Sequence, residues 1–181
     1  MEVIWKVENG PALLSPAVFK DDRGYFFESF NEKEFKEKVA DVTFVQDNQS
    51  KSQYGVLRGM HCQTGEYEQA KLVRVVKGAV IDVIADIRKT SSSYGRVYFA
   101  YLSEENKRMF YVPRGYVHGF LTLKDDTIFQ YKCDNYYNKE SERGYNYKSI
   151  PFNWNNFINI DDIKLSVKDA FSPMYIFDFD E

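Results

Sequence analysis

The sequence predicts a mainly β protein, a sandwich or barrel with a few short helices. Between residues 72 and 133, short segments rich in Val, Ile, Phe and Tyr follow one another at regular spacing, and turn residues separate them. Within residues 80–87, apolar side chains at the odd positions alternate with Asp82, Ile84 and Asp86, the period of a strand. Because the 181 residues contain no linker, repeat or low-complexity tract, we expect one domain that spans residues 1–181.

The N-terminal part predicts one strand and one short helix. Residues 24–30 are rich in Phe and Tyr and predict a strand. Asn31 follows as a helix N-cap, with Glu34 in the capping-box position three residues later. This helix is expected to end near Val39.

The middle of the chain predicts successive strands, and the end is less regular. The expected strands are 72–76, 80–87, 95–102, 109–112, 119–123 and 127–131, with a turn at Lys77-Gly78. Residues 158–181 lack a clear period, and within them residues 163–169 fit either a short helix or a wrapping loop.

Composition excludes several classes of protein. A net charge of −3 argues against a general nucleic-acid footprint. Two cysteines, Cys62 and Cys133, are too few for a disulfide framework and fit a reducing cytoplasm. The N-terminus lacks the pattern of a signal peptide, and no apolar run approaches the ~20 residues of a membrane span. We therefore expect a soluble, cytoplasmic protein with no membrane partner.

His61 is one of two histidines and the first candidate for a proton carrier, because imidazole titrates closest to neutral pH. Arg58 lies three residues before it and Lys71 ten residues after it. A base near cations suits a reaction that removes a proton from carbon and must hold the resulting anion. The alternative is a histidine packed in the core.

Arg58 and His61 are an odd number of residues apart, so a flat strand would point them to opposite faces. Gly59 between them could form a bulge that re-aims one side chain.

The second histidine, His118, lies in Pro113-Arg114-Gly115-Tyr116-Val117-His118, a P-x-G-x-x-H pattern. This pattern resembles the second half of the cupin signature and implies a cupin-type jelly-roll β-barrel. Metal-binding cupins also have an H-x-H in the first half of the signature, where this chain has His61-Cys62-Gln63. The usual donor set is incomplete, so we expect no metal. His118 then either contacts a ligand in a pocket or is a hydrogen-bonded structural histidine.

Further segments match one family in order and spacing. They are Asp22-Arg23-Gly24, residues 44–50, 57–63, 69–73, 78–83, 113–120, 131–137 and 165–169. Together they closely resemble the dTDP-4-dehydrorhamnose 3,5-epimerase family, from about Phe19 to Asp169. The resemblance implies a cofactor-free cupin isomerase, usually a homodimer. Such enzymes invert C3 and C5 of a nucleotide-linked 4-keto-6-deoxyhexose.

The resemblance also implies a role for each matched catalytic residue. His61 would be the base, and Asp169 would be the carboxylate that orients it. Tyr131 would be the acid on the opposite face of the sugar, and Lys71 would stabilise the enolate. Arg58 would assist in binding and charge balance.

Other matched positions imply contacts to a nucleotide-diphosphate sugar. Phe26 and Tyr137 are candidates to stack on the base, and arginine and lysine suit the diphosphate. The expected substrate-binding residues are Arg23, Phe26, Glu28, Gln46, Asp47, Asn48, Arg58, His118, Tyr137, Glu142 and Lys168.

Two positions depart from the family pattern. Cys62 stands where the family more often has Tyr, and Met60 where Leu is usual. Since the loss of a ring beside His61 would make room for another sugar, alternatives stay open. One is an epimerase that acts at C3 only, or on a GDP-linked 4-keto-6-deoxyheptose for capsule synthesis. A non-catalytic sugar-nucleotide-binding cupin and a metal-dependent cupin oxygenase are the alternatives from other classes.

Overall fold

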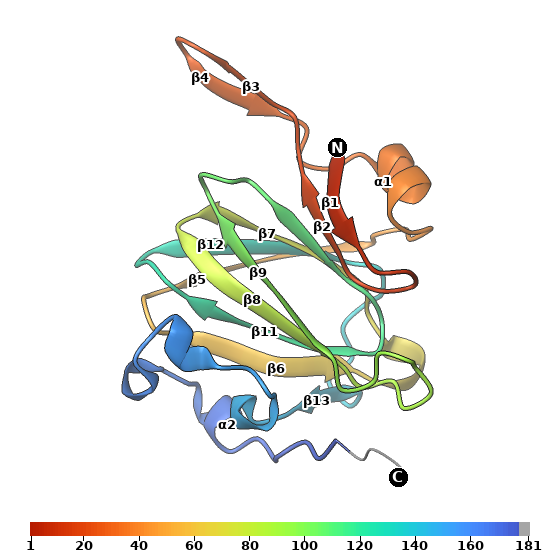
Figure 1. Cartoon of the computed structure of the whole chain (residues 1–181), viewed down its shortest axis with the longest axis vertical. Helices are drawn as coiled ribbons and strands as arrows, with labels where there is room; N and C mark the ends of the chain where they lie inside the picture. The colour runs from red at the N-terminus through yellow and green to blue at the C-terminus, as the bar shows by residue number, and fades with distance from the viewer. Residues whose placement is uncertain (178–181) are drawn as a thin grey trace.

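The computed structural model describes residues 1–177, and its main body is two antiparallel sheets that face each other in a jelly-roll barrel (Figure 1). The six-stranded sheet has the order β1 (Glu2–Lys6), β2 (Ala12–Ser15), β10 (Met109–Val112), β7 (Lys71–Lys77), β12 (Thr127–Cys133) and β5 (Gln46–Ser52). The five-stranded sheet has the order β13 (Glu142–Gly144), β6 (Leu57–Gln63), β11 (Tyr116–Thr122), β8 (Ala79–Asp86) and β9 (Val97–Ser103). The prediction of a mainly β, cupin-type barrel is confirmed.

The remaining elements are short. A separate hairpin consists of β3 (Val18–Asp21) and β4 (Gly24–Phe27). The two α-helices are α1 (Glu32–Lys38) and α2 (Val167–Ala170). Single 3₁₀ turns lie at η1 (Gly65–Tyr67), η2 (Tyr147–Ser149), η3 (Trp154–Asn156) and η4 (Ile160–Asp162).

Strand β8 is buried on both faces, which the alternation in its sequence did not predict. Val80 and Ile84 point between the two sheets, while Ile81 and Val83 point to the outer face of the five-stranded sheet. Asp82 also lies in this strand and is fully buried. Successive side chains of β8 do alternate between the two faces of the sheet, but both faces are buried, so neither face is exposed to solvent.

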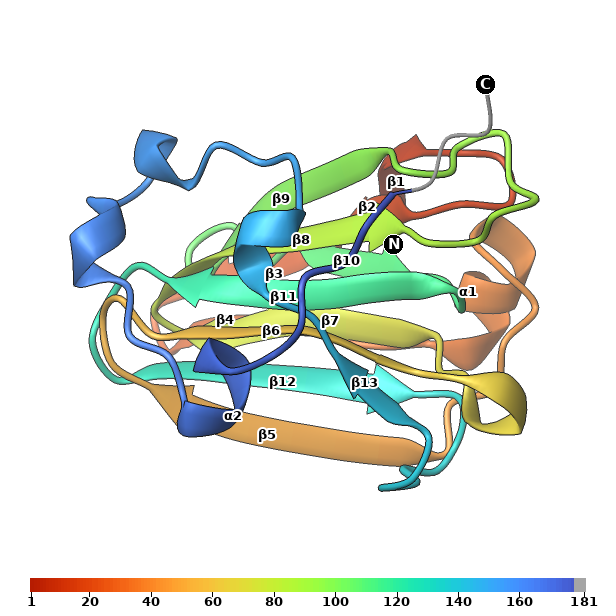
Figure 2. The ribbon, with the colours of Figure 1, turned by 90° about the horizontal axis from the view of Figure 1, so that it is seen from below.

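The C-terminal segment accounts for the burial of that outer face. It crosses the five-stranded sheet (Figure 2), and its Tyr147, Trp154 and Ile158 pack against residues of the sheet such as Leu57. Lys164 anchors it by backbone hydrogen bonds with Gly55 and Leu57, of 2.8 and 3.0 Å. Residues 163–166 therefore wrap the barrel and lead into α2, so both forms expected for 163–169 occur. Of the irregular stretch 158–181, residues 178–181 lie outside the described part of the chain.

Helix α1 covers the outer face of the other sheet and begins as predicted. The Asn31 side chain accepts a hydrogen bond from the backbone N–H of Glu34, at 3.1 Å. The Glu34 carboxylate does not return to Asn31; it pairs with the amino group of Met1 at 2.8 Å. Half of a capping box forms, because a charged partner lies within reach of the glutamate. Phe35 inserts fully into the core beneath the helix.

The predicted strand 24–30 is too long. Strand β4 ends at Phe27, and Phe30 turns inward to pack on Phe35 and Phe44 beside α1. The hairpin that remains projects away from the barrel (Figure 1). Two other predicted strands shift: β9 begins at Val97, and β11 begins at Tyr116 and so contains His118.

Candidate active site

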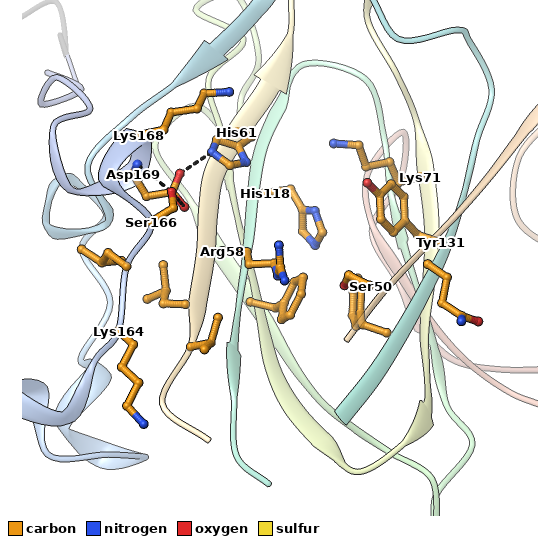
Figure 3. Close-up of a pocket in the computed structure, with 16 residues that line it drawn as sticks. Ser50, Arg58, His61, Lys71, His118, Tyr131, Lys164, Ser166, Lys168 and Asp169 are labelled. Carbon is orange, nitrogen blue, oxygen red and sulfur yellow. Dashed lines mark hydrogen bonds and ion pairs between the residues drawn. The ribbon is translucent and has the colours of Figure 1, made fainter. Parts of the chain in front are cut away.

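A cavity of about 440 Å³ lies between the two sheets, bounded on one side by the C-terminal segment. Strands β5, β6, β7, β11 and β12 and residues 164–169 supply its walls (Figure 3). Seven predicted site residues line it: Arg58, His61, Lys71, His118, Tyr131, Lys168 and Asp169.

A bulge in β6 brings Arg58 and His61 to the same cavity. His61 pairs with His118 on β11 and Arg58 pairs with Phe120, so three steps along β6 match two steps along β11. Gly59 occupies the extra position with φ +125°. A Cβ atom on Gly59 would lie 2.5 Å from the Cα of Gly119, so only glycine allows this close approach. The predicted bulge is confirmed, and it resolves the conflict in strand parity.

His61 is hydrogen-bonded to Asp169. Its Nε2 lies 2.6 Å from Oδ1 of the carboxylate, and its other ring nitrogen faces the cavity (Figure 3). Ser166, the N-cap of α2, donates its hydroxyl to Oδ2 of Asp169 at 2.9 Å. Burial opposes the charge of Asp169, but the hydrogen bonds from His61 and Ser166 outweigh it and lower the carboxyl pKa. An ionised Asp169 suits a proton on Nε2 and a free lone pair on the nitrogen that faces the cavity.

His118 forms a second pair, with Asp82 on the neighbouring strand β8. Its Nε2 lies 3.0 and 2.8 Å from the two oxygens of the Asp82 carboxylate. Burial raises the pKa of Asp82, and His118 partly offsets that effect. The hydrogen bond to Asp82 supports the interpretation of His118 as a structural histidine. Its ring also lines the cavity, so contact with a ligand stays a prediction.

Lys71 and Tyr131 lie across the cavity from His61 (Figure 3). Lys71 is the first residue of β7, and Tyr131 comes from the adjacent strand β12. Burial raises the pKa of the Tyr131 phenol, so it carries its proton at neutral pH. The cavity therefore offers a candidate proton acceptor on one wall and a candidate donor and a cation on the other.

A smaller lobe of about 160 Å³ continues from the same three residues, His61, Lys71 and Tyr131. Its other walls include predicted substrate contacts: Gln46, Asn48, Tyr137 and Glu142. Glu142 holds this region together, because it pairs with the ammonium of Lys168 at 2.5 Å and accepts the Tyr137 hydroxyl at 3.0 Å. Burial raises the pKa of Glu142, but these contacts outweigh burial and lower it overall.

Four predicted contacts lie away from the cavity of their own chain. Arg23, Phe26 and Glu28 belong to the projecting hairpin or its base, and Phe26 is 70% exposed. The Arg23 guanidinium pairs only locally, with Asp21 at 2.6 Å. Asp47 points to the opposite face of β5, where its carboxylate pairs with Lys132 at 3.0 Å.

Cys62 does not line the main cavity, but it is among the residues around the smaller lobe, so the expectation that its small size makes room for another sugar stays a prediction. It is 6% exposed and packs in the outer core with Met60 and Tyr147. The reason is strand alternation, since the neighbouring His61 takes the inward position. The departure at residue 62 therefore bears on packing beneath the C-terminal segment.

Asp82 and Ser166 support the site but were not among the residues predicted from the sequence. The signal for Asp82 was a carboxylate inside an otherwise apolar strand, since a buried charge needs a partner. The signal for Ser166 was its place three residues before Asp169, the spacing of a helix N-cap.

Within residues 1–177, no three His, Cys, Asp or Glu side chains are grouped so that they could hold a metal ion. The helices in that part of the chain are all too short or too polar to cross a membrane.

Comparison with known proteins identifies the relatives of this chain. Residues 8–175 match the family model of dTDP-4-dehydrorhamnose 3,5-epimerase. The enzyme of that name from Shigella flexneri is 51% identical over 145 residues, which cover 78% of this chain and 80% of the relative.

Solved structures that resemble this chain belong to enzymes with similar names. The dTDP-4-dehydrorhamnose 3,5-epimerase of Elizabethkingia anophelis superposes with a TM-score of 0.89 at 45% identity, covering 97% of this chain and 96% of the other. A dTDP-6-deoxy-D-glucose-3,5-epimerase of Legionella pneumophila, solved in complex with dTDP-4-keto-L-rhamnose, has a TM-score of 0.88 at 39% identity, covering 95% of this chain and 90% of the other. The chain belongs to the dTDP-4-dehydrorhamnose 3,5-epimerase family.

Proposed function

We propose that this protein is an isomerase that inverts C3 and C5 of dTDP-4-keto-6-deoxyglucose. One observation carries the proposal: the His61–Asp169 pair faces Tyr131 and Lys71 across a single cavity. The names of the relatives favour action at both carbons of a dTDP-linked hexose over the C3-only and GDP-heptose alternatives.

The ketone at C4 acidifies the protons on C3 and C5. His61 takes one of these protons from carbon, and the electron pair moves onto the ketone oxygen to give an enolate. Asp169 stabilises the imidazolium that forms, and Lys71 stabilises the oxyanion. Tyr131 then donates its proton to the same carbon from the opposite face, and exchange with water resets both residues. The same cycle at the second carbon completes the isomerisation without a change in oxidation state.

The remaining cavity residues bind substrate in this proposal. Arg58 and Lys168 provide cations for the diphosphate, and Tyr137 provides a ring for the base. Gln46, Asn48 and Glu142 provide hydrogen bonds from the smaller lobe. His118, held by Asp82, contacts the sugar from the wall beside His61.

The deuterium content of the product tests the reaction. The protein is incubated with dTDP-4-keto-6-deoxyglucose in deuterated water, and the sugar is analysed by mass spectrometry and proton NMR. We expect deuterium at both C3 and C5. Deuterium at C3 alone would reduce the activity to a 3-epimerase. If no exchange occurs, the proposal fails for this substrate, and a GDP-linked 4-keto-6-deoxyheptose becomes the next substrate to test.

Tyr131→Phe tests the acid. The variant keeps the ring but loses the proton, so kcat should fall about 100-fold or more while the Kd for dTDP stays within about twofold. An equal loss in both would instead assign Tyr131 to binding.

The hairpin contacts fit a homodimer in which each subunit completes the site of the other. Phe26 and Phe19 are 70% and 65% exposed, and the Arg23 side chain is 90% exposed. Large exposed aromatic side chains beside an arginine are typical of interfaces. In this arrangement Arg23, Phe26 and Glu28 reach the nucleotide in the cavity of the partner subunit.

Mixed dimers test this arrangement. His61→Asn removes the base, and Arg23→Ala/Phe26→Ala removes the hairpin contacts. After the two variants are mixed and allowed to exchange subunits, half of the dimers contain one intact composite site, so activity should recover to about a quarter of the wild-type value. No recovery, in a mixture shown to contain mixed dimers, would assign the hairpin to its own subunit.

A further inference from the structure

The loop between β12 and β13, residues 134–141, carries Tyr137 to the edge of the smaller lobe. It buries little apolar surface, since Tyr136 and Tyr137 are 64% and 52% exposed, and polar contacts such as that of the Asn135 side-chain nitrogen to the Glu66 carbonyl, at 2.8 Å, tie it to the body. A loop with so little buried apolar surface needs polar contacts to keep one conformation.

Two glutamine side chains of the barrel supply such contacts. The Gln63 side-chain oxygen accepts a hydrogen bond from the backbone N–H of Asn138 at 3.0 Å. The Gln69 side-chain nitrogen donates to the backbone carbonyl of Asn135 at 2.8 Å. The two bonds therefore fix the loop backbone on either side of Tyr137, at Asn135 and Asn138. Because a backbone N–H only donates and a carbonyl only accepts, the orientation of both amides is fixed.

Gln63 also connects the loop to the strand that carries His61. It lies two residues after His61 on β6, on the same face, and is 7% exposed. A buried carboxamide whose oxygen is bonded is costly to replace by an apolar side chain, because the loop N–H would lose its partner. Gln46 makes a longer contact, 3.3 Å to the N–H of Tyr137, but it is itself a proposed substrate contact.

We propose that Gln63 and Gln69 are positioning residues that hold the 134–141 loop, and with it the ring of Tyr137, in the conformation that receives the nucleotide base. This inference rests on the proposed function for the identity of the ligand. The two residues act through opposite requirements: position 63 must accept a hydrogen bond, and position 69 must donate one.

Matched substitutions separate the two requirements. Gln63→Glu keeps an acceptor oxygen whether or not it is ionised, whereas Gln63→Met loses it with little change in volume. Gln69→Glu, when ionised, adds the same charge close by but cannot donate, and Gln69→Met cannot donate either. If the two glutamines hold the loop in this way, glutamate should preserve the loop conformation at position 63 and disturb it at position 69.

Two readouts apply to all four variants. Hydrogen exchange followed by mass spectrometry, on the ligand-free protein, should show lost protection of residues 134–141 in Gln63→Met, Gln69→Met and Gln69→Glu. Residues 123–126, at the opposite end of β12, should be unaffected. Calorimetry with dTDP should show the Kd rise about tenfold in the same three variants, and kcat should fall far less than affinity.

The outcomes are distinct. The proposal that the two glutamines hold the loop fails if protection of residues 134–141 is unchanged in all the variants. It also fails if Gln63→Glu and Gln69→Glu lower that protection equally in the ligand-free protein. Lost protection with an unchanged Kd would overturn the role of the two glutamines in nucleotide binding. If the wild-type protein does not bind dTDP at all, the proposed function fails, and the exchange data still decide whether the two glutamines hold the loop.

Discussion

The protein contains two His–Asp pairs on neighbouring strands, and they differ in depth. His61 on β6 and His118 on β11 are direct cross-strand partners. In the His61–Asp169 pair, the side chains are 29% and 5% exposed; in the His118–Asp82 pair, they are 9% and 0% exposed. The same two functional groups therefore lie in different surroundings on adjacent strands.

Their origins differ as well. Asp82 belongs to β8, an interior strand of the five-stranded sheet, and both its oxygens lie within 3.0 Å of His118 Nε2. Asp169 comes from the C-terminal segment, 108 residues from His61. One of its carboxylate oxygens is hydrogen-bonded to His61 and the other accepts the hydroxyl of Ser166. His61 is the more exposed of the two histidines, which suits its proposed exchange of protons with a substrate, whereas the deeper His118–Asp82 pair suits the fixing of a ring. Depth, not residue type, separates the two proposed roles.

The largest expected contrast is in turnover. His61→Asn should lower kcat by about 100- to 10,000-fold, because it removes the proposed base, and its circular dichroism should match the wild type. His118→Asn should raise KM more than it lowers kcat, because its proposed role is contact with the sugar. Comparable kcat losses in both variants would mean that the two histidines share the proton transfer.

The free energy of unfolding should depend more on the His118–Asp82 pair than on the His61–Asp169 pair, the reverse of the order expected for turnover. Asp82→Ala leaves His118 buried without its partner and should cost about 3–5 kcal/mol of unfolding free energy. Asp169→Ala leaves His61, which is 29% exposed and can bond to water instead, so it should cost about 1 kcal/mol. Urea denaturation of both variants beside the wild type measures the difference. Equal losses would contradict the division between a structural and a functional pair.

Replacement of Asp169 by its amide sharpens the comparison within the His61–Asp169 pair. Asp169→Asn keeps the shape but removes the charge that stabilises the imidazolium, so kcat should fall about tenfold or more with little loss of stability. Ser166→Ala is a matched control, since it removes a hydrogen bond to the carboxylate and leaves the charge; its effect on kcat should be smaller.

The smallest expected effect is in the pH dependence of stability, and its sign differs between the pairs. The pKa of Asp169 is lowered below its ordinary 3.8, so its contribution is present above that pH and is lost as pH falls through the folded-state pKa. The pKa of Asp82 is raised by burial, so the cost of its charge is relieved as pH falls.

Denaturation from about pH 3 to about pH 5 should resolve these slopes. The stability difference between wild type and Asp169→Asn should grow as pH rises, and that between wild type and Asp82→Asn should shrink. Parallel slopes would show that the two carboxylates titrate in equivalent surroundings.

The sequence by itself determined features that depend on neighbours in the chain. The Asn31 cap, the strands between residues 71 and 133, and the bulge at Gly59 follow from side chains within a few positions of each other. The order of its motifs was also enough to identify the family.

Only the tertiary structure decided which side chains meet. It paired Asp82 with His118, turned Cys62 into the outer core, and left Arg23 and Phe26 on a hairpin remote from their own cavity. The physical reason is that strand order and register set contacts between strands, and one extra residue at a bulge reverses the face of those that follow. The face to which each side chain points therefore cannot be assigned until the partner strand and its register are known.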